Sequence, residues 1–166
     1  MIERIERLRD LQFGQLMMVY EESNRHNGEA NYPYLSLEEQ FMAAEQDFYR
    51  YLQLFFKEKN GFVLILSNGR RYISALRAER YKDGYLLEAL ETLPDQRNRG
   101  YAGKLVRELL TWADERNLPI YSHVSKSNFP SISVHRKCGF RKILDYAVYV
   151  DGSVNDRACT LRYHKQ

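Results

Sequence analysis

Three residues that favour anion binding lie together between an apolar strand pattern and a helix pattern. Arg97, Arg99 and Gly100 follow the turn residue Pro94 within the stretch Leu86–Lys104. The first backbone N–H groups of a helix have no intrahelical partner, and the helix dipole is positive at that end. Arginine side chains add positive charge, and glycine permits a close backbone approach. We therefore expect this turn to bind an anion such as a phosphate.

Two common phosphate motifs do not fit this turn. A P-loop requires a glycine, four residues and then Gly-Lys-Ser/Thr. Gly103 and Lys104 are present, but Asn98 and Leu105 stand at the other two required positions. The dinucleotide-binding fingerprint requires three glycines at fixed spacing, which Gly100 and Gly103 do not supply. The turn therefore belongs to another kind of site.

The segment Arg97–Ala102 resembles the (Gln/Arg)-x-x-Gly-x-(Gly/Ala) signature of the GNAT superfamily of N-acetyltransferases. A second segment, Asn128–Phe140, resembles the later motif of this superfamily, in which an asparagine precedes a small–isoleucine pair, an aromatic proton donor and Gly-Phe. A helix pattern and a strand pattern separate the two segments, as in GNAT folds. The resemblance covers nearly the whole chain, and it indicates the superfamily but no substrate.

The resemblance implies that the turn binds the pyrophosphate of acetyl-coenzyme A, which serves as co-substrate, and that no metal is involved. In the family the pantetheine arm runs along the strand before the turn. A backbone N–H of that strand, here near Leu93, binds the oxyanion. Asn128 and Ser131 correspond to positions beside the pantetheine, although both residues also suit a helix cap. The implied coenzyme-binding residues are Thr92, Leu93, Arg97, Asn98, Arg99, Gly100, Tyr101, Ala102, Gly103, Lys104, Asn128 and Ser131.

The implied reaction also needs groups that move protons. An alkylamine with a pKa of ~10.4 is mostly protonated at neutral pH, and the departing thiolate benefits from an acid. His135 occupies the position at which the family usually has a tyrosine, so it is the candidate acid. For the base, His123 ranks first, Glu88 second and Glu91 third. Strand alternation places Glu88 and Glu91 on opposite faces unless a bulge intervenes, so we expect at most one of them to face the site.

Periodicity and turn residues predict an α/β (α+β) fold with a central, mostly antiparallel mixed sheet flanked by about four helices. The pattern at Ile2–Leu8 fits either a short strand or a first helical turn. Asn27-Gly28 is expected to end the first helix, and a capping box at Ser36 and Glu39 to start the second. The other predicted elements are a loop at 27–35, strands at 62–66, 71–80 and 85–93, a helix from 99 to about 117, a strand at 120–124, a helix at 128–138, and strands at 140–150 and 158–163.

Length and composition limit the class of protein. With 166 residues, of which 44% are hydrophobic and 28% charged, we expect one domain over residues 1–166. A net charge of +3, with basic residues spread among acidic ones, gives no reason to expect nucleic acid binding. The charged N-terminus and the short apolar runs argue against a signal peptide and a membrane span. Cys138 and Cys159 lack metal-ligand spacing and a secretory context, so we expect a reduced, cytoplasmic protein.

The activity that the resemblance implies is transfer of the acetyl group of acetyl-coenzyme A to a primary amine, by direct attack in a ternary complex. The family builds its acceptor site from regions that correspond here to residues 20–50 and 146–157. Aromatic and acidic side chains in these regions would suit a small cationic amine or a peptide terminus. They are Tyr32, Tyr34, Phe41, Tyr146, Tyr149, Glu21, Glu22 and Glu29.

Two alternatives remain open on the same fold. One is a non-catalytic acyl-coenzyme A sensor or interaction domain, to which the missing tyrosine at position 135 gives weight. The other is an acyltransferase that uses a different acyl group, because the sequence does not give the size of the acyl pocket. Such folds commonly form homodimers, but no stretch of this chain specifies an interface.

Overall fold

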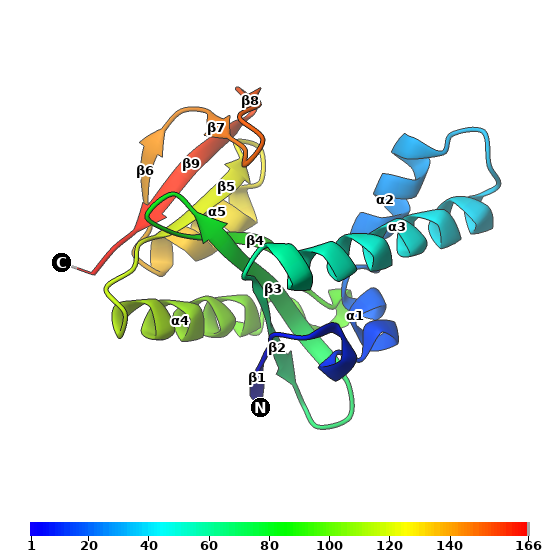
Figure 1. The fold of residues 1–166 in the computed structure, drawn as a ribbon, viewed down its shortest axis with the longest axis horizontal. Coiled ribbons are helices and arrows are strands. Elements are labelled where there is room, and N and C mark those ends of the chain that lie inside the picture. Colours follow the sequence, from blue (N-terminus) through cyan, green and yellow to red (C-terminus); the bar gives the residue numbers. More distant parts are fainter. Residues whose placement is uncertain (166) are drawn as a thin grey trace.

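The computed structural model describes residues 1–165, which form one large sheet with helices on both faces and a small hairpin sheet (Figure 1). The helices of this part of the chain are α1 (Phe13–Val19), α2 (Glu21–Asn31), α3 (Leu37–Glu58), α4 (Tyr101–Asp114) and α5 (Phe129–Lys137), with two 3-10 turns, η1 (Leu8–Asp10) and η2 (Pro94–Gln96). The strands are β1 (Ile2–Ile5), β2 (Phe62–Ser67), β3 (Tyr72–Tyr81), β4 (Gly84–Thr92), β5 (Ile120–Ser125), β6 (Arg141–Leu144), β7 (Ala147–Val148), β8 (Val154–Asn155) and β9 (Ala158–Tyr163). The predicted α/β fold class is confirmed.

The large sheet has the strand order β1-β2-β3-β4-β5-β9-β6, and its neighbouring strands are antiparallel except for β4 and β5. β4 and β5 run parallel, and their pairing extends from Tyr85–Ile120 to Leu87–Ser122. Beyond these residues the two strands separate. Within residues 1–165, no strand pairs with the backbone groups of β4 that face this gap, so these groups remain able to bind another chain or a ligand.

A β-bulge in β4 lies just beyond the point where the strands separate. The register with β3 shifts between Ala75 and Arg77, so that two residues of β4 face one residue of β3. Ala89, inside the bulge, has a left-handed backbone with a φ of 49°, which is unfavourable for a non-glycine residue. The buried Tyr20 donates its hydroxyl to the Ala89 carbonyl oxygen at 2.7 Å. A side chain from outside the sheet therefore stabilises the bulge.

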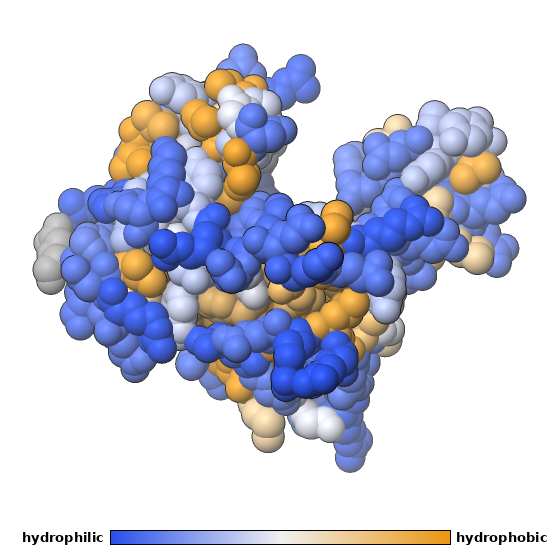
Figure 2. Space-filling model, in the orientation of Figure 1, coloured by the Kyte–Doolittle hydropathy of each residue, from blue (hydrophilic) through white to orange (hydrophobic). Residues whose placement is uncertain are grey.

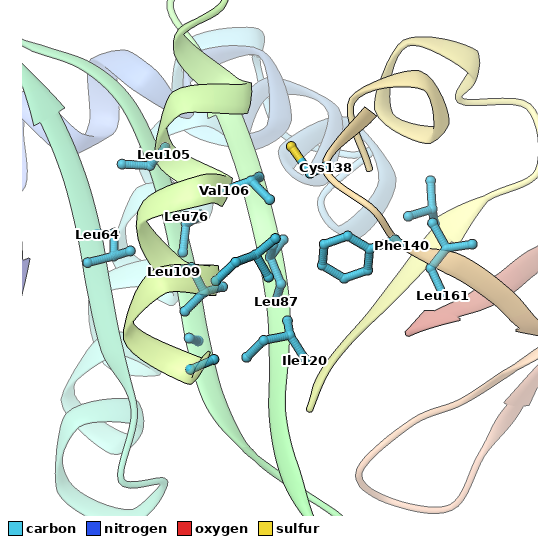
Figure 3. Packing of buried hydrophobic residues seen from close by; sticks show 14 of the residues in the cluster. Leu64, Leu76, Leu87, Leu105, Val106, Leu109, Ile120, Cys138, Phe140 and Leu161 are labelled. Atoms are coloured by element: carbon cyan, nitrogen blue, oxygen red, sulfur yellow. The ribbon is translucent and has the colours of Figure 1, made fainter. Parts of the chain in front are cut away.

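Two apolar cores hold the sheet between its helices. On one face, α4 and α5 cover the sheet, and Leu105, Val106 and Leu109 of α4 lie against the strands (Figure 3). On the other face, α1 and α3 cover β1–β4, with Leu16 and Phe55 completely buried. α2 and the N-terminal part of α3 extend beyond the sheet as an arm (Figure 1). The two cores therefore pack against β4 from both faces of the sheet, next to the gap.

The predicted end of the first helix near Gly28 is wrong. The chain changes direction at Tyr20, between α1 and α2, and α2 then continues through Gly28 to Asn31. A β-carbon at Gly28 would lie 2.5 Å from the Gln40 carbonyl oxygen, so this glycine allows α2 and α3 to cross closely. The predicted first helix is therefore two helices, and the loop predicted at 27–35 begins only after Asn31.

The strand predicted at 140–150 is interrupted. β6 ends at Leu144, and β7 pairs with β8 in the separate two-stranded sheet. Asp145, in the interruption, accepts hydrogen bonds from Lys126 at 3.1 Å and Lys142 at 2.9 Å. These exposed ion pairs lie at a bend where simple strand propensity predicted a straight continuation.

Local signals elsewhere in the chain predicted the structure well. The capping box is confirmed, because Ser36 accepts from the Glu39 N–H while the Glu39 carboxylate accepts from the Ser36 N–H. Gly139 ends α5 with a φ of 92°, as expected of a C′ glycine. The undecided N-terminal pattern forms a strand, β1, and then the turn η1.

Candidate active site

A cavity of about 960 Å³ lies at the gap between β4 and β5. Its lining comes from β4, the turn after it, the start of α4, β5 and α5, together with Glu22 and Ser23 of α2. Figure 2 shows a mainly hydrophilic surface that is hollowed between the β7–β8 hairpin and the α2–α3 arm. We call the cavity at the gap between β4 and β5 the main cavity.

The turn before α4 contains two residues with left-handed backbones. Asn98 has a φ of 62°, and Gly100, the N-cap of α4, has a φ of 78°. Since glycine has no side chain with which to cap the helix, the first N–H groups of α4 stay free of a side-chain acceptor at this position. Gly100, Tyr101, Ala102 and Gly103 all line the main cavity. This is the arrangement that binds an anion at a helix N-terminus.

Arg97 lines the main cavity but is already engaged. Its Nη2 lies 2.6 Å from a carboxylate oxygen of Glu22, and its Nε donates to the Thr92 carbonyl oxygen at 3.1 Å. The arginine therefore connects α2 to the end of β4. A phosphate would have to compete with Glu22 for this guanidinium.

Three residues predicted to bind the coenzyme lie outside the lining of the main cavity. Arg99 and Lys104 are exposed, and Leu93 is buried in the core under α1. The Leu93 N–H, expected to bind the oxyanion, donates instead to the Ile73 carbonyl oxygen at 2.9 Å. Arg107, which the sequence patterns did not single out, lines the cavity one turn after Gly103. The remaining predicted coenzyme-binding residues, including Thr92, line the cavity.

Asn128 and Ser131 line the main cavity at the start of α5. The Asn128 side-chain oxygen accepts a hydrogen bond from the Ser131 N–H at 3.1 Å. The capping role that both residues allow is therefore present, and their position at the cavity is compatible with ligand contact as well.

His135 lines the main cavity from the buried side of α5, with 1% of its surface exposed. Its Nδ1 lies 2.8 Å from the Ser131 carbonyl oxygen, and since a carbonyl only accepts, Nδ1 carries the hydrogen. The buried Nε2 has no hydrogen-bond partner in the described chain. Burial lowers the pKa of His135, and the Ser131 carbonyl partly offsets this effect. The neutral imidazole therefore presents an acceptor, and service as an acid requires a second proton on Nε2.

His123 lines the main cavity at the first position of β5 beyond its pairing with β4. The rings of Tyr81 and Tyr149 meet the imidazole edge-on, each with a centroid distance of 5.5 Å. Both ring nitrogens are buried and have no partner among residues 1–165. Burial, and then the positive charge of Lys82, lower the pKa of His123. The imidazole is thus neutral at neutral pH and has a lone pair available for a proton.

Glu88 and Glu91 both line the main cavity, whereas we expected at most one of them to face the site. The bulge is the reason, because the extra residue between them returns both side chains to the face covered by α1–α3. Glu91 accepts a hydrogen bond from the Ser23 hydroxyl. One buried oxygen of Glu88 has no hydrogen-bond partner in the described chain. Burial raises the pKa of both carboxyl groups. The charge of Arg77 partly offsets this effect for Glu88, and the hydrogen bond from Ser23 partly offsets it for Glu91.

A second cavity of about 580 Å³ adjoins the main cavity between α2, α3 and the strands β3 and β4. Four residues, Glu22, Ser23, Ala89 and Glu91, line both spaces. We call the second space the side cavity. The rest of its lining is Tyr20, Asn24, His26, Asn27, Phe48, Tyr51 and Arg77.

Most residues predicted for the acceptor site are not among the residues that line these cavities. Glu22 lines both cavities, as expected of an acceptor-site residue. Tyr32 and Tyr34 pack against each other near the tip of the arm, and Phe41 stacks under an arginine of α2. The predicted acceptor residues outside both linings are Tyr32, Tyr34, Phe41, Tyr146, Tyr149, Glu21 and Glu29.

Sequence patterns did not single out Tyr20, Ser23 or Arg77. Tyr20 belongs to an ordinary apolar helix stripe, and Ser23 is one serine in a polar helix. Arg77 carried the one available signal, a charged residue within the apolar run of β3. The bulge and the crossing of α2 over α3 bring the three residues to the cavities, and neither feature is visible in local periodicity.

Within residues 1–165, no group of three His, Cys, Asp or Glu side chains is placed to hold a metal ion. None of the described helices combines the length and the apolar character of a membrane span.

Comparison with known protein families matches residues 18–140 to the Acetyltransferase (GNAT) family. The chain belongs to the GNAT acetyltransferase family. The matched region contains the turn before α4, the gap between β4 and β5, and α5. A search of curated proteins finds no match.

Solved acetyltransferase structures share the fold of this chain at low sequence identity. PaiA N-acetyltransferase from Thermoplasma acidophilum, in complex with coenzyme A, has a TM-score of 0.65 and 13% identity, with 99% of each chain covered. IAA acetyltransferase from Bacillus cereus has a TM-score of 0.62 and 15% identity, with 99% of each chain covered. An acetyltransferase from Streptococcus agalactiae has a TM-score of 0.64 and 16% identity, with 99% of this chain and 98% of that chain covered.

Proposed function

We propose that the protein transfers the acetyl group of acetyl-coenzyme A to a primary amine by direct attack in a ternary complex. The observation that carries this proposal is the gap between β4 and β5. It meets the uncapped start of α4 at one end and the unpartnered imidazole of His123 at the other. Membership of the GNAT family supports acetyl transfer. The coenzyme A bound to the Thermoplasma PaiA N-acetyltransferase supports this donor.

The residues of the main cavity fit coenzyme A. Backbone N–H groups at Gly100–Gly103 would bind the pyrophosphate, and Arg107 adds positive charge. The unpaired edge of β4 beyond Leu87 offers backbone groups to the amides of the pantetheine arm, as a neighbouring strand would. Bound in this way, acetyl-coenzyme A supplies an acetyl thioester.

His123 is the base in this proposal. A primary amine is mostly protonated at neutral pH and must lose a proton before its nitrogen attacks the acetyl carbon. Because burial keeps His123 neutral, its imidazole can accept that proton directly or through a water molecule. The C–N bond then forms as the C–S bond breaks. Glu88 and then Glu91 are the next candidates, since burial raises the basicity of both carboxylates.

His135 is proposed as the acid that protonates the departing thiolate from Nε2. It can do so only after Nε2 has taken up a second proton, which burial opposes. The measurement that decides this role is the rate of acetyl transfer in a single turnover. An unchanged rate in His135→Ala would remove His135 from the chemical step.

The experiment that tests the function is a thiol-release assay with acetyl-coenzyme A and a broad panel of primary amines. Turnover with any amine supports the proposal, and acylated product identified by mass spectrometry confirms the position of the acetyl group. Coenzyme binding without turnover by any amine would contradict it and favour the sensor alternative. Parallel reactions with longer or acidic acyl-coenzyme A donors test the choice of acyl group.

A further inference from the structure

Arg77 projects from the middle of β3 into the side cavity, on the sheet face covered by α3. Aromatic rings lie close to its guanidinium, with the centroid of Tyr51 at 4.8 Å and that of Phe48 at 5.3 Å from the central carbon. Such stacking holds a planar guanidinium in one orientation and leaves its N–H edge free to donate. The side chain is therefore preorganised for a planar partner.

Among residues 1–165, the guanidinium of Arg77 forms no ion pair, and its buried Nε has no hydrogen-bond partner. Glu88 is its neighbour across the strands, and Glu79 is nearby, but Glu79 pairs with Lys59 at 3.0 Å. Glu91 accepts its hydrogen bond from Ser23 instead. A buried Nε donor without an acceptor at a cavity wall is unfavourable unless a ligand or a water molecule accepts from it.

We propose that Arg77 binds a carboxylate of the acceptor, so that the substrate is an amino acid or another small molecule with both a primary amine and a carboxylate. This inference rests on the proposed amine acetylation. The two cavities adjoin, since they share Glu22, Ser23, Ala89 and Glu91, and the proposed acceptor would extend from Arg77 in the side cavity toward His123 in the main cavity.

The charges around the two cavities fit such an acceptor. Glu88 and Glu91 lie on β4, between Arg77 on β3 and the gap. The amino group of the acceptor would contact their carboxylates there, whether it is protonated or neutral. An acceptor with only positive charge would leave the donors of Arg77 unsatisfied and add a like charge beside it. A guanidinium edge matches a carboxylate with two parallel hydrogen bonds, and an ammonium group has no such match.

Matched acceptor pairs test this inference. Each pair consists of an amino acid and the amine that lacks its carboxylate: phenylalanine with phenethylamine, lysine with cadaverine, and tyrosine with tyramine. The series glycine, β-alanine and 4-aminobutyrate varies the distance between amine and carboxylate. We expect the carboxylate-bearing member of at least one pair to have a kcat/KM about 10- to 100-fold higher, as a charge-assisted hydrogen-bonded pair would give.

Arg77→Met and Arg77→Lys test whether Arg77 is the origin of the preference. Arg77→Met should remove the preference by raising the KM for the carboxylate-bearing acceptor, while the KM for acetyl-coenzyme A stays unchanged. Arg77→Lys keeps the charge but loses the paired geometry, and it should keep only part of the preference. Arg80→Met is the matched control, because Arg80 is an exposed arginine of the same strand that also stacks on a ring, that of Tyr85. It should retain the preference in full.

The outcomes separate this inference from the proposed function. Turnover of simple amines that equals or exceeds that of their carboxylate-bearing partners, in every pair, would overturn the inference and leave amine acetylation standing. A preference that survives in a folded Arg77→Met or Arg77→Lys unchanged would overturn the assignment to Arg77. Absence of turnover with every amine would overturn the proposed function and the inference with it.

Discussion

The two sides of the gap between β4 and β5 are built from different parts of the chain. The side at α4 consists mainly of backbone, with left-handed Asn98 and Gly100 and an uncapped helix start. The opposite side, which we call the acceptor side, consists of side chains on the face covered by α1–α3. Glu88 and Glu91 line the main cavity there, and Arg77 lies next to them in the side cavity. The first depends on the φ angles of a few consecutive residues, and the second depends on how distant elements pack.

This difference offers a reason why proteins of this fold could retain one acetyl donor while the acceptor amine varies. A backbone site accepts many side chains provided that the residues with left-handed φ are retained. A side-chain site changes whenever a residue of α2, β3 or β4 is replaced, and such a replacement leaves the turn before α4 intact. We therefore expect mutations to separate cleanly into those that affect acetyl-coenzyme A and those that affect the amine.

The largest expected change in activity comes from the substitution His123→Gln, which removes the proposed base. Loss of a general base should lower kcat by about 10²- to 10⁴-fold at neutral pH. In the wild type, kcat/KM should fall as the pH drops through the pKa of His123. Burial places that pKa below the usual value of about 6.5. Initial-rate pH profiles measure this limb, which should be missing in His123→Gln. A limb that is unchanged in the variant would assign the base to another residue.

The second prediction tests whether packing sets the acceptor side. Gly28→Ala places a β-carbon 2.5 Å from the Gln40 carbonyl oxygen, so it should lower the free energy of unfolding by about 1–3 kcal/mol. It should also raise the KM for the amine, because α2 carries Glu22 and Ser23 into the cavities. Denaturant titration and steady-state kinetics measure the two effects.

The control for Gly28 is Gly14→Ala. Gly14 lies in α1, and an added β-carbon there would meet no atom of residues 1–165 within 4 Å apart from its chain neighbours and the backbone of α1 itself. Alanine at this position should therefore stabilise the protein by about 0.5–1 kcal/mol. Equal behaviour of the two variants would contradict a close crossing of α2 over α3.

The third prediction tests the backbone side. Gly100→Val forces a β-branched residue into a φ of 78°, at a cost of about 1–2 kcal/mol. We expect the KM for acetyl-coenzyme A to rise about tenfold while the KM for the amine changes little. Gly69→Val is the control, because Gly69 has a φ of 85° and similarly open surroundings far from the gap. A similar rise in KM for Gly69→Val would mean that general destabilisation, and not the turn, is responsible.

The smallest expected effect concerns the bulge that joins the two sides. Tyr20→Phe removes the hydrogen bond to the Ala89 carbonyl oxygen, which should lower the free energy of unfolding by about 1 kcal/mol. Ala89→Gly should act in the opposite direction, since glycine tolerates a φ of 49° without strain. Thermal unfolding compares the two. Destabilisation by Ala89→Gly would show that the left-handed φ of Ala89 does not lower the free energy of unfolding.

The sequence predicted the backbone side better than the side-chain side, for a physical reason. The conformation of a turn is encoded locally, so the spacing of Arg97, Gly100 and Ala102 carried the information. The positions of the side chains in that turn were harder to predict from the sequence, because Arg97 pairs with Glu22 and Arg99 is exposed to solvent. Their orientation depends on α2, which lies far away in the chain.

The acceptor side could not be predicted because its parts meet only in the folded protein. Strand alternation placed Glu88 and Glu91 on opposite faces, and a single bulge residue reversed that prediction. Gly28 looked like a helix end, although the contact that explains it lies on α3. The aromatic residues Tyr32 and Tyr34 were in the expected region of sequence but lie near the tip of the arm.

Coenzyme A binding along the unpaired edge of β4 would also affect how long the protein survives in a cell. Coenzyme A that binds along this edge would complete the sheet as an added strand, and a ligand that binds only the folded chain stabilises it by mass action. At a concentration 100 times its Kd, the gain is about 2.7 kcal/mol. A cell short of coenzyme A would therefore hold more of this protein in opened, protease-sensitive states, so abundance would follow the donor supply as activity does.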